Sequence, residues 1–392
     1  NSGSYSIKNK IFRQPAATVH SSGLIECIGA DGSRLIHKSH GKEHVVKAYI
    51  ADHEAGMKKL LGILTDPEMG VIKSISEIKA VGHRVVHGGE TYSAPAIITP
   101  DVLKAVEACA DLAPLHNPPN LTGIYASSAA LPGVPQVAVF DTAFHQTMPK
   151  TAYLYALPQE YYENYHIRRY GFHGTSHHYV TRKAAVLLNK PESDTNIITC
   201  HLGNGGSVTA VRGGRSVDTS MGLTPLEGIV MGTRSGDIDP SIPWFLAKKG
   251  MTPDEINNVL NKKSGLLGIS GVSNDMRNLL EAANGGNAQA RLAVDIFCYR
   301  IRKYVGSYLA VLGHTDAVVF TGGIGENNAF IRHSVLDGLG ELGICIDDAK
   351  NSAKSRDARD VSSAASKVKV LVIPTDEEGY IASETFRLVT GD

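Results

Sequence analysis

Three glycine-rich turns carry the residue types from which anion-binding loops are built: NSGSYSIK (1–8), HLGNGG (201–206) and TGGIGEN (321–327). Glycine lets the backbone approach an anion closely, and backbone N–H groups then donate to its oxygens. No GxxxxGK[ST] motif occurs, and no GxGxxG opens an early strand–helix unit. The sequence therefore excludes a P-loop enzyme, disfavours a Rossmann dehydrogenase and predicts phosphate binding by loops of another kind.

Two arginines lie in segments that are otherwise rich in small residues. Arg84 lies in GHRVVHGG (82–89) and Arg234 in GTRSGD (232–237). The planar guanidinium fork matches carboxylate and phosphoryl oxygens. A lone arginine is most often a surface residue, but the glycines on both sides of these two favour anion binding.

Three histidines occur close together in GFHGTSHHYV (171–180), namely His173, His177 and His178. A zinc site is disfavoured because no HExxH motif and no nearby cysteine accompanies them. We expect His173 to lie at the start of a helix capped by Thr175 or Ser176, where it could donate to a ligand oxygen. His177 and His178 are predicted to be structural.

Two carboxylates are candidate Mg²⁺ ligands. Asp141 follows an apolar strand, and Glu377 lies in PTDEE (374–378). Mg²⁺ usually takes one or two protein carboxylates and completes its shell with water and phosphate oxygens.

The elements that must position these residues alternate along the chain, as in α/β domains. Short apolar runs at 137–140, 197–200 and 317–320 predict strands, and each run ends in a polar or glycine-rich turn. Ligands collect at the carboxyl ends of strands in open α/β sheets. Helices are predicted from Thr99-Pro100, from the capping box at 252–255, and over 287–312. The pattern N-x-G-S-x-[S/T] occurs at 1–6 and again at 204–209, which indicates two related domains.

Composition limits the remaining classes. The chain has 39 basic and 39 acidic residues, so net charge argues against nucleic acid or an anionic membrane as main partner. No apolar run approaches the ~18 residues of a membrane span, and the first residues lack a signal-peptide core. Five scattered cysteines predict a reducing, cytoplasmic location. The chain starts without Met, and we expect residues upstream.

Together the motifs closely resemble the acetate and propionate kinase family. The matching segments run in family order from Asn1 to about Phe386 and are NSGSYSIK, GHRVVHGG, APLHNPPN, VAVFDTAFHQTMP, YGFHGTSHHYV, HLGNGGSV, DTSMGLTPLEGIVMGTRSGDID, SGLLGISG, FTGGIGEN and IPTDEE. The resemblance implies two duplicated ribonuclease-H-like α/β domains of the actin, sugar-kinase and Hsp70 type, with an interdomain cleft. It implies residues 1–141 with 378–392 as an acyl-substrate domain and 142–377 as a nucleotide and dimerisation domain. A homodimer is expected, with acetate and ATP as substrates and Mg²⁺ or Mn²⁺ as cofactor.

The resemblance also assigns roles by position. The catalytic residues would be Asp141, His173 and Arg234. The acyl substrate would be bound by Arg84, through its carboxylate, and by an apolar pocket of Val86, Leu115, Phe172 and Pro225. The nucleotide would contact Ser4, Ser6, Lys8, His201, Leu202, Gly203, Asn204, Gly205, Asp275, Met276, Arg277, Gly323, Ile324, Gly325, Glu326 and Asn327. The metal would be held by Asn1 and Glu377. Val86 favours acetate, because propionate-preferring relatives resemble the motif with alanine there.

This sequence departs from the family pattern at three places. The short apolar strand that normally precedes the first asparagine is absent, Tyr5 stands where serine is usual, and Asp376 replaces the asparagine of PTNEE. We expect neither substitution to abolish activity.

The chemistry expected of such a site follows from charge. A carboxylic acid has a pKa of about 4, so acetate is ionised at neutral pH and needs no base. The difficulty is its repulsion from a polyanionic phosphate. Arg84, Arg234 and Mg²⁺ would neutralise that repulsion, and His173 would stabilise the phosphoryl group in flight. Asp141 is then expected to orient Arg234 or a metal-bound water rather than to act as a general base.

Three alternatives remain open. The first is a propionate or butyrate kinase. The second is an actin-like or Hsp70-like ATPase module, which would have no reason to keep Arg84, Arg234 and His173 together. The third is a zinc hydrolase that uses the three neighbouring histidines.

Overall fold

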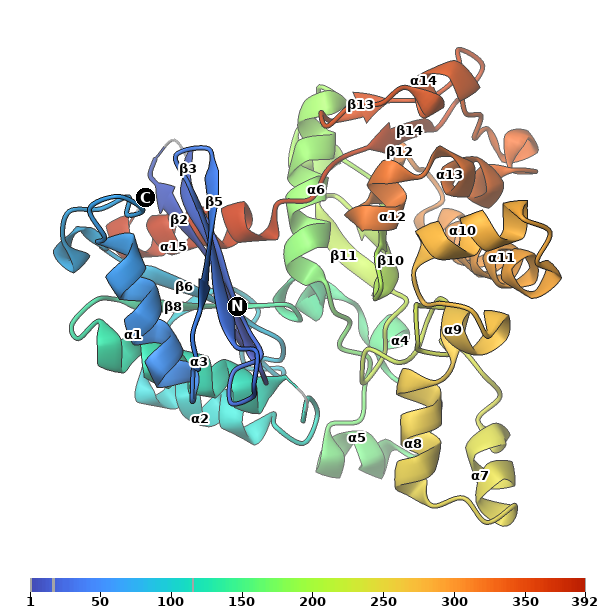
Figure 1. The fold of residues 1–392 in the computed structure, drawn as a ribbon. Coiled ribbons are helices and arrows are strands. Elements are labelled where there is room, and N and C mark those ends of the chain that lie inside the picture. The colour runs from blue at the N-terminus through green and yellow to red at the C-terminus, as the bar shows by residue number, and fades with distance from the viewer. Residues whose placement is uncertain (1, 16–17, 115, 392) are drawn as a thin grey trace. The chain divides into compact units, whose positions relative to one another are not determined.

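The computed structural model describes residues 2–15, 18–114 and 116–391 of the chain. The chain divides into two compact units, a first unit of Asn1–Phe144 with Asp376–Asp392 and a second unit of His145–Thr375. Both units combine sheets with helices (Figure 1), so the predicted mixed α/β class is confirmed. Within the described ranges, no helix is long and apolar enough to cross a membrane. Asn1 and Leu115 lie outside the described residues.

The first unit contains two sheets. One is antiparallel with strand order β1-β2-β3-β4-β5, and the other has the order β6-β8-β7 with β6 and β8 parallel. Burial alternates along β3 and β4, as expected for a sheet with one packed and one solvated face. The strands are β1 (Ser2–Gly3), β2 (Ser6–Arg13), β3 (Thr18–Glu26), β4 (Arg34–Ser39), β5 (Lys42–Lys47), β6 (Val81–Val85), β7 (Ala96–Ile97) and β8 (Gln136–Phe140).

Two apolar clusters hold the helices of the first unit. The helix α1 (His53–Leu64) buries Leu60 and Leu64 beside Ile25 and Leu35 of the antiparallel sheet. The helices α2 (Pro100–Ala108) and α3 (Asn117–Ala130) pack in a second cluster with Phe140 of β8. Each such side chain contributes about 1.5–3 kcal/mol by leaving water. A short helical turn, η1, spans Ile75–Glu77.

The last helix, α15 (Glu377–Thr390), packs against β6, β7 and β8. Gly82 of β6 faces it, since a Cβ there would lie 2.3 Å from Thr385 Oγ1. The N-cap of α15 is Asp376, whose Oδ1 accepts a hydrogen bond from the Gly379 N–H at 3.0 Å. Asn is as good an N-cap as Asp, so the fold accommodates the departure from the family motif.

The second unit is built on one six-stranded sheet with the order β11-β10-β9-β12-β14-β13. The strands β9, β10 and β11 pair antiparallel, whereas β9, β12 and β14 run parallel, which is the strand order of a ribonuclease-H-like domain. The central strands β9 and β12 are buried along their whole length, as expected for strands covered on both faces. The strands are β9 (Ile197–Leu202), β10 (Gly206–Arg212), β11 (Arg215–Thr219), β12 (Ala317–Thr321), β13 (Arg359–Asp360) and β14 (Lys369–Val372).

The helix α6 (Gly174–Leu187) packs on β9 and β12, and α11 (Ala288–Leu312) packs on β9 and β10 from the other side (Figure 1). The remaining helices are α4 (Lys150–Tyr153), α5 (Gln159–Tyr165), α7 (Ser241–Lys248), α8 (Pro253–Lys262), α9 (Gly265–Ser270), α10 (Met276–Asn284), α12 (Gly322–Asn327), α13 (Ala329–Leu336) and α14 (Asp348–Ser352). Short helical turns are η2 (Ala143–Thr147), η3 (Glu192–Asp194) and η4 (Gly340–Leu342).

Most element predictions are confirmed. The three predicted strands lie within β8, β9 and β12, and the predicted long helix is α11, which is capped by Asn287 and ends at Gly313. The predicted cap of α6 is wrong, because the N-cap is His173 in a left-handed conformation (φ 57°). Thr175 and Ser176 already lie in the first turn of α6.

The cap of α15 gives a matched pair of variants. Asp376→Ala removes the acceptor for the Gly379 N–H and should cost about 1 kcal/mol, or roughly 2–4 °C in unfolding midpoint. Asp376→Asn keeps the acceptor and should change the midpoint by much less. Differential scanning calorimetry of the full chain would measure both, and an equal loss in the two variants would contradict the capping role.

Candidate active site

In the first unit, Arg84 of β6 and Asp141 after β8 form a bidentate ion pair. Arg84 Nε donates to Asp141 Oδ1 at 3.0 Å, and Arg84 Nη2 donates to Oδ2. The parallel register places Val85 beside Phe140, and the Asp141 N–H donates to the Val85 carbonyl at 2.9 Å. Asp141 is fully buried, whereas the Arg84 side chain retains about a fifth of its exposure. The pair therefore fixes one edge of the guanidinium at the carboxyl end of two strands.

The charged groups around this pair shift one another's pKa values. Burial alone would lower the pKa of Arg84, but attraction and hydrogen bonding to Asp141 outweigh burial and raise it. Burial raises the pKa of Glu377 to about 7, and the negative charges of Asp141 and Glu378 add to the effect, while Arg84 and Lys8 oppose it. Glu377 is thus a carboxyl group with too little positive charge around it.

The backbone that follows Arg84 is held by side chains of α3. Asn120 Oδ1 accepts from the Val86 N–H at 3.0 Å, and Asn117 Oδ1 accepts from the His87 N–H at 3.1 Å. Asn117 Nδ2 in turn donates to the His87 carbonyl at 3.0 Å. A Cβ at Gly88 would lie 2.7 Å from the Phe140 ring, so only glycine fits there. The two asparagines had no role assigned from sequence, although the motif APLHNPPN contains both.

Of the predicted phosphate residues in the first unit, Ser4 lies in the turn between β1 and β2, and Ser6 and Lys8 lie at the start of β2. Lys8 Nζ lies 2.5 Å from Glu378 Oε1, which joins β2 to the start of α15. His53 Nε2 lies 2.8 Å from the Gly3 carbonyl and holds the turn from α1. Tyr5 is 71% exposed, so the unusual residue is accommodated without packing cost.

In the second unit, His173, Arg234 and Gly205 converge. A Cβ on Gly205 would lie 3.5 Å from His173 Nε2 and 3.6 Å from Arg234 Nη1. Arg234 Nη1 donates to the Pro225 carbonyl at 3.3 Å, and among the described residues no carboxylate pairs with it. Burial lowers the pKa of Arg234. A half-buried guanidinium beside a glycine turn and a histidine is suited to hold an anion.

The predicted nucleotide segments of the second unit lie side by side at the carboxyl ends of β9 and β12. Thr321 pairs with His201 in the parallel ladder, and a Cβ at Gly322 would lie 2.7 Å from the Leu202 carbonyl oxygen. Asn204 Oδ1 accepts from Asn274 Nδ2 at 2.9 Å, which brings in the segment 275–277. This placement follows the rule that ligands collect at the carboxyl ends of parallel strands.

Two residues in and just after α12 are structural supports. Glu326 Oε1 accepts from the Gly322 N–H at 2.8 Å and from the Thr375 N–H at 3.0 Å. Arg332 is fully buried and donates to the carbonyls of Gly325 and Glu326 at 2.8 and 2.9 Å. Burial lowers the pKa of Arg332 to about 10. Arg332 was not predicted from the sequence, because no motif distinguishes it from a surface arginine.

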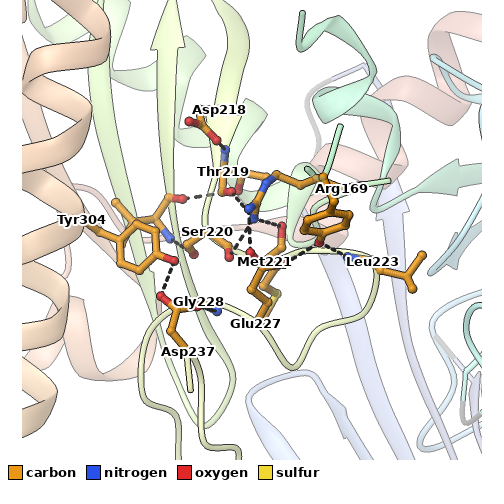
Figure 2. Close-up of polar contacts among 12 residues, drawn as sticks. Arg169, Asp218, Thr219, Ser220, Met221, Leu223, Glu227, Gly228, Asp237 and Tyr304 are labelled. Carbon is orange, nitrogen blue, oxygen red and sulfur yellow. Dashed lines mark hydrogen bonds and ion pairs between the residues drawn. The ribbon is translucent and has the colours of Figure 1, made fainter. Parts of the chain in front are cut away.

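A network of half-buried polar side chains anchors the segment that carries Pro225 and Arg234 (Figure 2). Arg169 Nη2 donates to Glu227 Oε1 at 2.6 Å, and Nη1 donates to the carbonyls of residues 219–221. Tyr155 Oη donates to Glu227 Oε2 at 2.5 Å. Tyr304 of α11 donates to Asp237 Oδ2 at 2.7 Å, while Asp237 Oδ1 accepts from the Gly228 N–H. The Arg234 loop is therefore fixed at both of its ends.

The zinc hypothesis is not supported by the histidine geometry. His177 is buried with Nδ1 2.7 Å from Thr199 Oγ1 and Nε2 2.7 Å from Ser207 Oγ, so both ring nitrogens are used. His178 faces Glu192 at 3.4 Å. Over the described ranges, no group of three or more His, Cys, Asp or Glu side chains could hold a metal.

A magnesium ion needs fewer protein ligands, and the first unit fits one. Glu377 is a hard oxygen donor whose raised pKa reflects burial beside Asp141 and Glu378. A divalent cation would compensate this negative charge, with water and phosphate oxygens completing its shell. The other predicted ligand, Asn1, lies outside the described residues.

The raised pKa of Glu377 predicts a pH-dependent stability. The ordinary pKa is 4.5 and the folded value about 7, so the contribution of this carboxyl group is present below pH 4.5 and lost as pH rises through 7. In chelated protein, Glu377→Gln should therefore raise the unfolding midpoint at pH 8 and change it little at pH 4.5.

Glu378 is the matched control, because Lys8 and Lys10 outweigh the effect of its burial and lower its pKa. Glu378→Gln should lower the midpoint at pH 8. The same sign of change in both variants would contradict the opposite environments of the two carboxylates.

Known proteins are similar to this chain over nearly its full length. The family model described as "Acetokinase family" matches residues 1–383. The acetate kinase of Brachyspira hyodysenteriae is 56% identical over 391 residues, which cover 99% of this chain and 98% of that protein. The crystal structure of Porphyromonas gingivalis acetate kinase matches with a TM-score of 0.96 at 46% identity, covering 99% of this chain and 98% of that one.

A propionate kinase from Francisella tularensis subsp. tularensis SCHU S4 matches with a TM-score of 0.93 at 44% identity, with coverage of 99% and 98%. Both the family match and these identities extend over nearly the full length. The chain belongs to the acetokinase family.

Proposed function

We propose that this chain catalyses the reversible, Mg²⁺-dependent transfer of the γ-phosphoryl group of ATP to acetate, giving acetyl phosphate and ADP by direct in-line transfer. The predicted family and reaction class, a phosphotransferase with a carboxylate acceptor, are confirmed by the family match and the acetate kinases of high identity. The observation that carries the residue-level proposal is Arg234, a half-buried cation that no described carboxylate neutralises, beside His173 and a glycine turn.

On the acyl side, Arg84 binds the acetate carboxylate. Asp141 occupies Nε and Nη2, so the guanidinium is held in one orientation when the substrate arrives. Val86 is buried, and its N–H is fixed by Asn120, which makes it a rigid wall for the acyl methyl group. Phe172, which is buried, and Pro225, whose carbonyl accepts from Arg234, both belong to the second unit, and we assign them to the acyl-binding residues as well.

On the nucleotide side, the segments 201–205, 275–277 and 323–327 bind ATP, with Ser4, Ser6 and Lys8 contacting its phosphates. Arg234 and His173 stabilise the charge on the phosphoryl group as it transfers. When bound, Mg²⁺ neutralises phosphate charge, and Glu377 with Asn1 would hold it. His173 approaches through Nε2, since Nδ1 lies 2.9 Å from Ser207 Oγ.

Asp141 acts by holding Arg84 rather than as a general base. Acetate carries no proton to remove at neutral pH. Asp141 pairs with Arg84 in the structure, and orientation of Arg234 or a metal-bound water by this carboxylate stays a prediction.

A propionate kinase is the second candidate, because a solved propionate kinase matches this chain almost as well as an acetate kinase does. An ATPase module without an acyl substrate is disfavoured, since it gives no reason for Arg84 to sit against Asp141 with part of its guanidinium exposed.

We also propose a homodimer in which the second unit supplies the interface and the nucleotide site. The helix α7 exposes Ile242, Trp244 and Phe245, and Trp244 is 61% exposed. Apolar side chains grouped this way are typical of a surface that another subunit covers. All five cysteines are free, which agrees with the proposed cytoplasmic location.

Hydroxylamine trapping tests the reaction directly. The full chain with ATP and Mg²⁺ should form hydroxamate fastest, per molar acyl substrate, with acetate, then propionate, then butyrate. Chelation should abolish the product. An equal or higher rate with propionate would show a larger pocket than Val86 implies, and ATP hydrolysis without hydroxamate would refute acyl phosphate synthesis.

Asp141→Asn separates a positioning role from a general base. Loss of a charge-assisted bond of about 1.5–3 kcal/mol should lower kcat/KM for acetate roughly 10- to 150-fold. The pH profile should keep its shape, and loss of an ionisation from it would contradict this role. Asp316→Asn is a control, because Asp316 is a mostly buried carboxylate paired with Lys190 at 2.7 Å in an ion pair with no assigned role.

A further inference from the structure

His173 is linked to the interior of the second unit by a chain of hydrogen bonds. Ser207 Oγ on β10 lies 2.9 Å from His173 Nδ1 and 2.7 Å from His177 Nε2. His177 Nδ1 lies 2.7 Å from Thr199 Oγ1 on β9. The two histidines are four residues apart at the start of α6, so their rings lie on one face of the helix and share one hydroxyl.

This series of hydrogen bonds ends at Thr199. Thr199, His177 and Ser207 are fully buried, and the described residues provide no other hydrogen-bond partner for Thr199 Oγ1. If this hydroxyl accepted a hydrogen from His177, its own hydrogen would be left buried without an acceptor, at a cost of about 1–3 kcal/mol. Thr199 therefore donates to His177 Nδ1, and His177 carries its hydrogen on Nε2.

This assignment fixes which atom donates in each of the remaining hydrogen bonds. His177 Nε2–H donates to Ser207 Oγ, and Ser207 has a single hydrogen, which it donates to His173 Nδ1. His173 is left with its own hydrogen on Nε2, the nitrogen that lies near Gly205. We propose that Thr199, His177 and Ser207 are positioning residues that hold His173 as a neutral imidazole with its hydrogen on Nε2, ready to donate to the transferring phosphoryl group.

The surroundings oppose protonation as well. His201 stacks on His173 with ring centroids 4.4 Å apart, and Arg234 Nη1 lies on the same side of Gly205 as His173 Nε2. His177 faces His145 at 5.7 Å and His201 at 6.2 Å, and burial with these two neighbours lowers its pKa well below the ordinary value. His145, His201 and Arg234 are neutral or cationic groups, and none of these three favours an imidazolium.

Protonation of His173 to the cation would also disrupt this series of hydrogen bonds. The His173 Nδ1–H would need Ser207 Oγ as acceptor while His177 Nε2–H already donates to that oxygen. Either the Ser207 hydroxyl hydrogen loses its acceptor, or every hydrogen bond in the series exchanges donor and acceptor. The second change leaves the Thr199 hydroxyl hydrogen without an acceptor. His173 is thus a fixed hydrogen-bond donor and does not act as a general acid or base over the working pH range.

The test is long-range ¹H–¹⁵N spectroscopy of histidine side chains in full-length protein labelled at histidine, with His173→Asn used to identify the His173 signals. Wild-type His173 should carry its hydrogen on Nε2 at pH 7 and should stay neutral below its ordinary pKa of about 6.5. Ser207→Ala should give mixed tautomers and easier protonation, whereas Ser207→Thr keeps the hydroxyl and should retain the wild-type signals.

Kinetics provide the second readout. Ser207→Ala should lower kcat about 3- to 10-fold at pH 7, as expected for one lost hydrogen bond, and further at pH 6 as the cation forms. Thr199→Val, whose change lies two side chains away from His173, should shift the His173 tautomer in the same direction, with Thr199→Ser as its control. Should a serine variant fail to fold, the threonine pair still tests the chain.

The inference rests on the proposed role of His173 at the phosphoryl group, but the two can fail separately. A hydrogen on Nδ1 or a doubly protonated ring in the wild-type protein at pH 7 would overturn the tautomer assignment and leave the reaction standing. Unchanged His173 signals in Ser207→Ala would overturn it too. Absence of hydroxamate with the expected spectrum would refute the reaction and retain the tautomer.

Discussion

Burying a guanidinium is costly unless an anion lies beside it, and this constraint shapes the candidate site in both units. Arg84 has such an anion within the protein, because Asp141 binds two of its nitrogens at the ends of adjacent parallel strands. Arg234 meets the constraint only in part, through the Pro225 carbonyl. One arginine is thus oriented by a resident carboxylate, and the other has no carboxylate partner among the described residues.

The rest of the structure keeps these cations in place with buried polar groups. Asn117 and Asn120 bind the backbone after Arg84, and the Arg169–Glu227 pair with the Tyr304–Asp237 bond fixes the segment around Arg234. Arg169 uses both terminal nitrogens in this network, donating through Nη1 to three backbone carbonyls and through Nη2 to Glu227, and such a set of directed bonds favours one arrangement of the loop. Rigidity of this kind suits a site that stabilises charge on a transferring group.

Sequence patterns predicted the elements well where the physics is local. Asn287 and Gly313 delimit the longest helix. Short apolar runs predicted β8, β9 and β12, which end at Phe140, Leu202 and Thr321. The predicted cap of α6 was wrong because no local sequence pattern marks a histidine in the left-handed conformation at an N-cap. Arg332 and Ser207 were missed since their roles depend on groups far away in the sequence.

By itself, the sequence determined the α/β class, the glycine turns, the identity of the candidate residues and the family they belong to, because residue types, spacing and local propensity are written along the chain. Tertiary structure alone decided the partners: that Asp141 binds Arg84, that α15 brings Glu377 to this pair, and that one serine hydroxyl joins two histidines. Partner choice depends on distance and burial across separate elements, and neither quantity has a local signature.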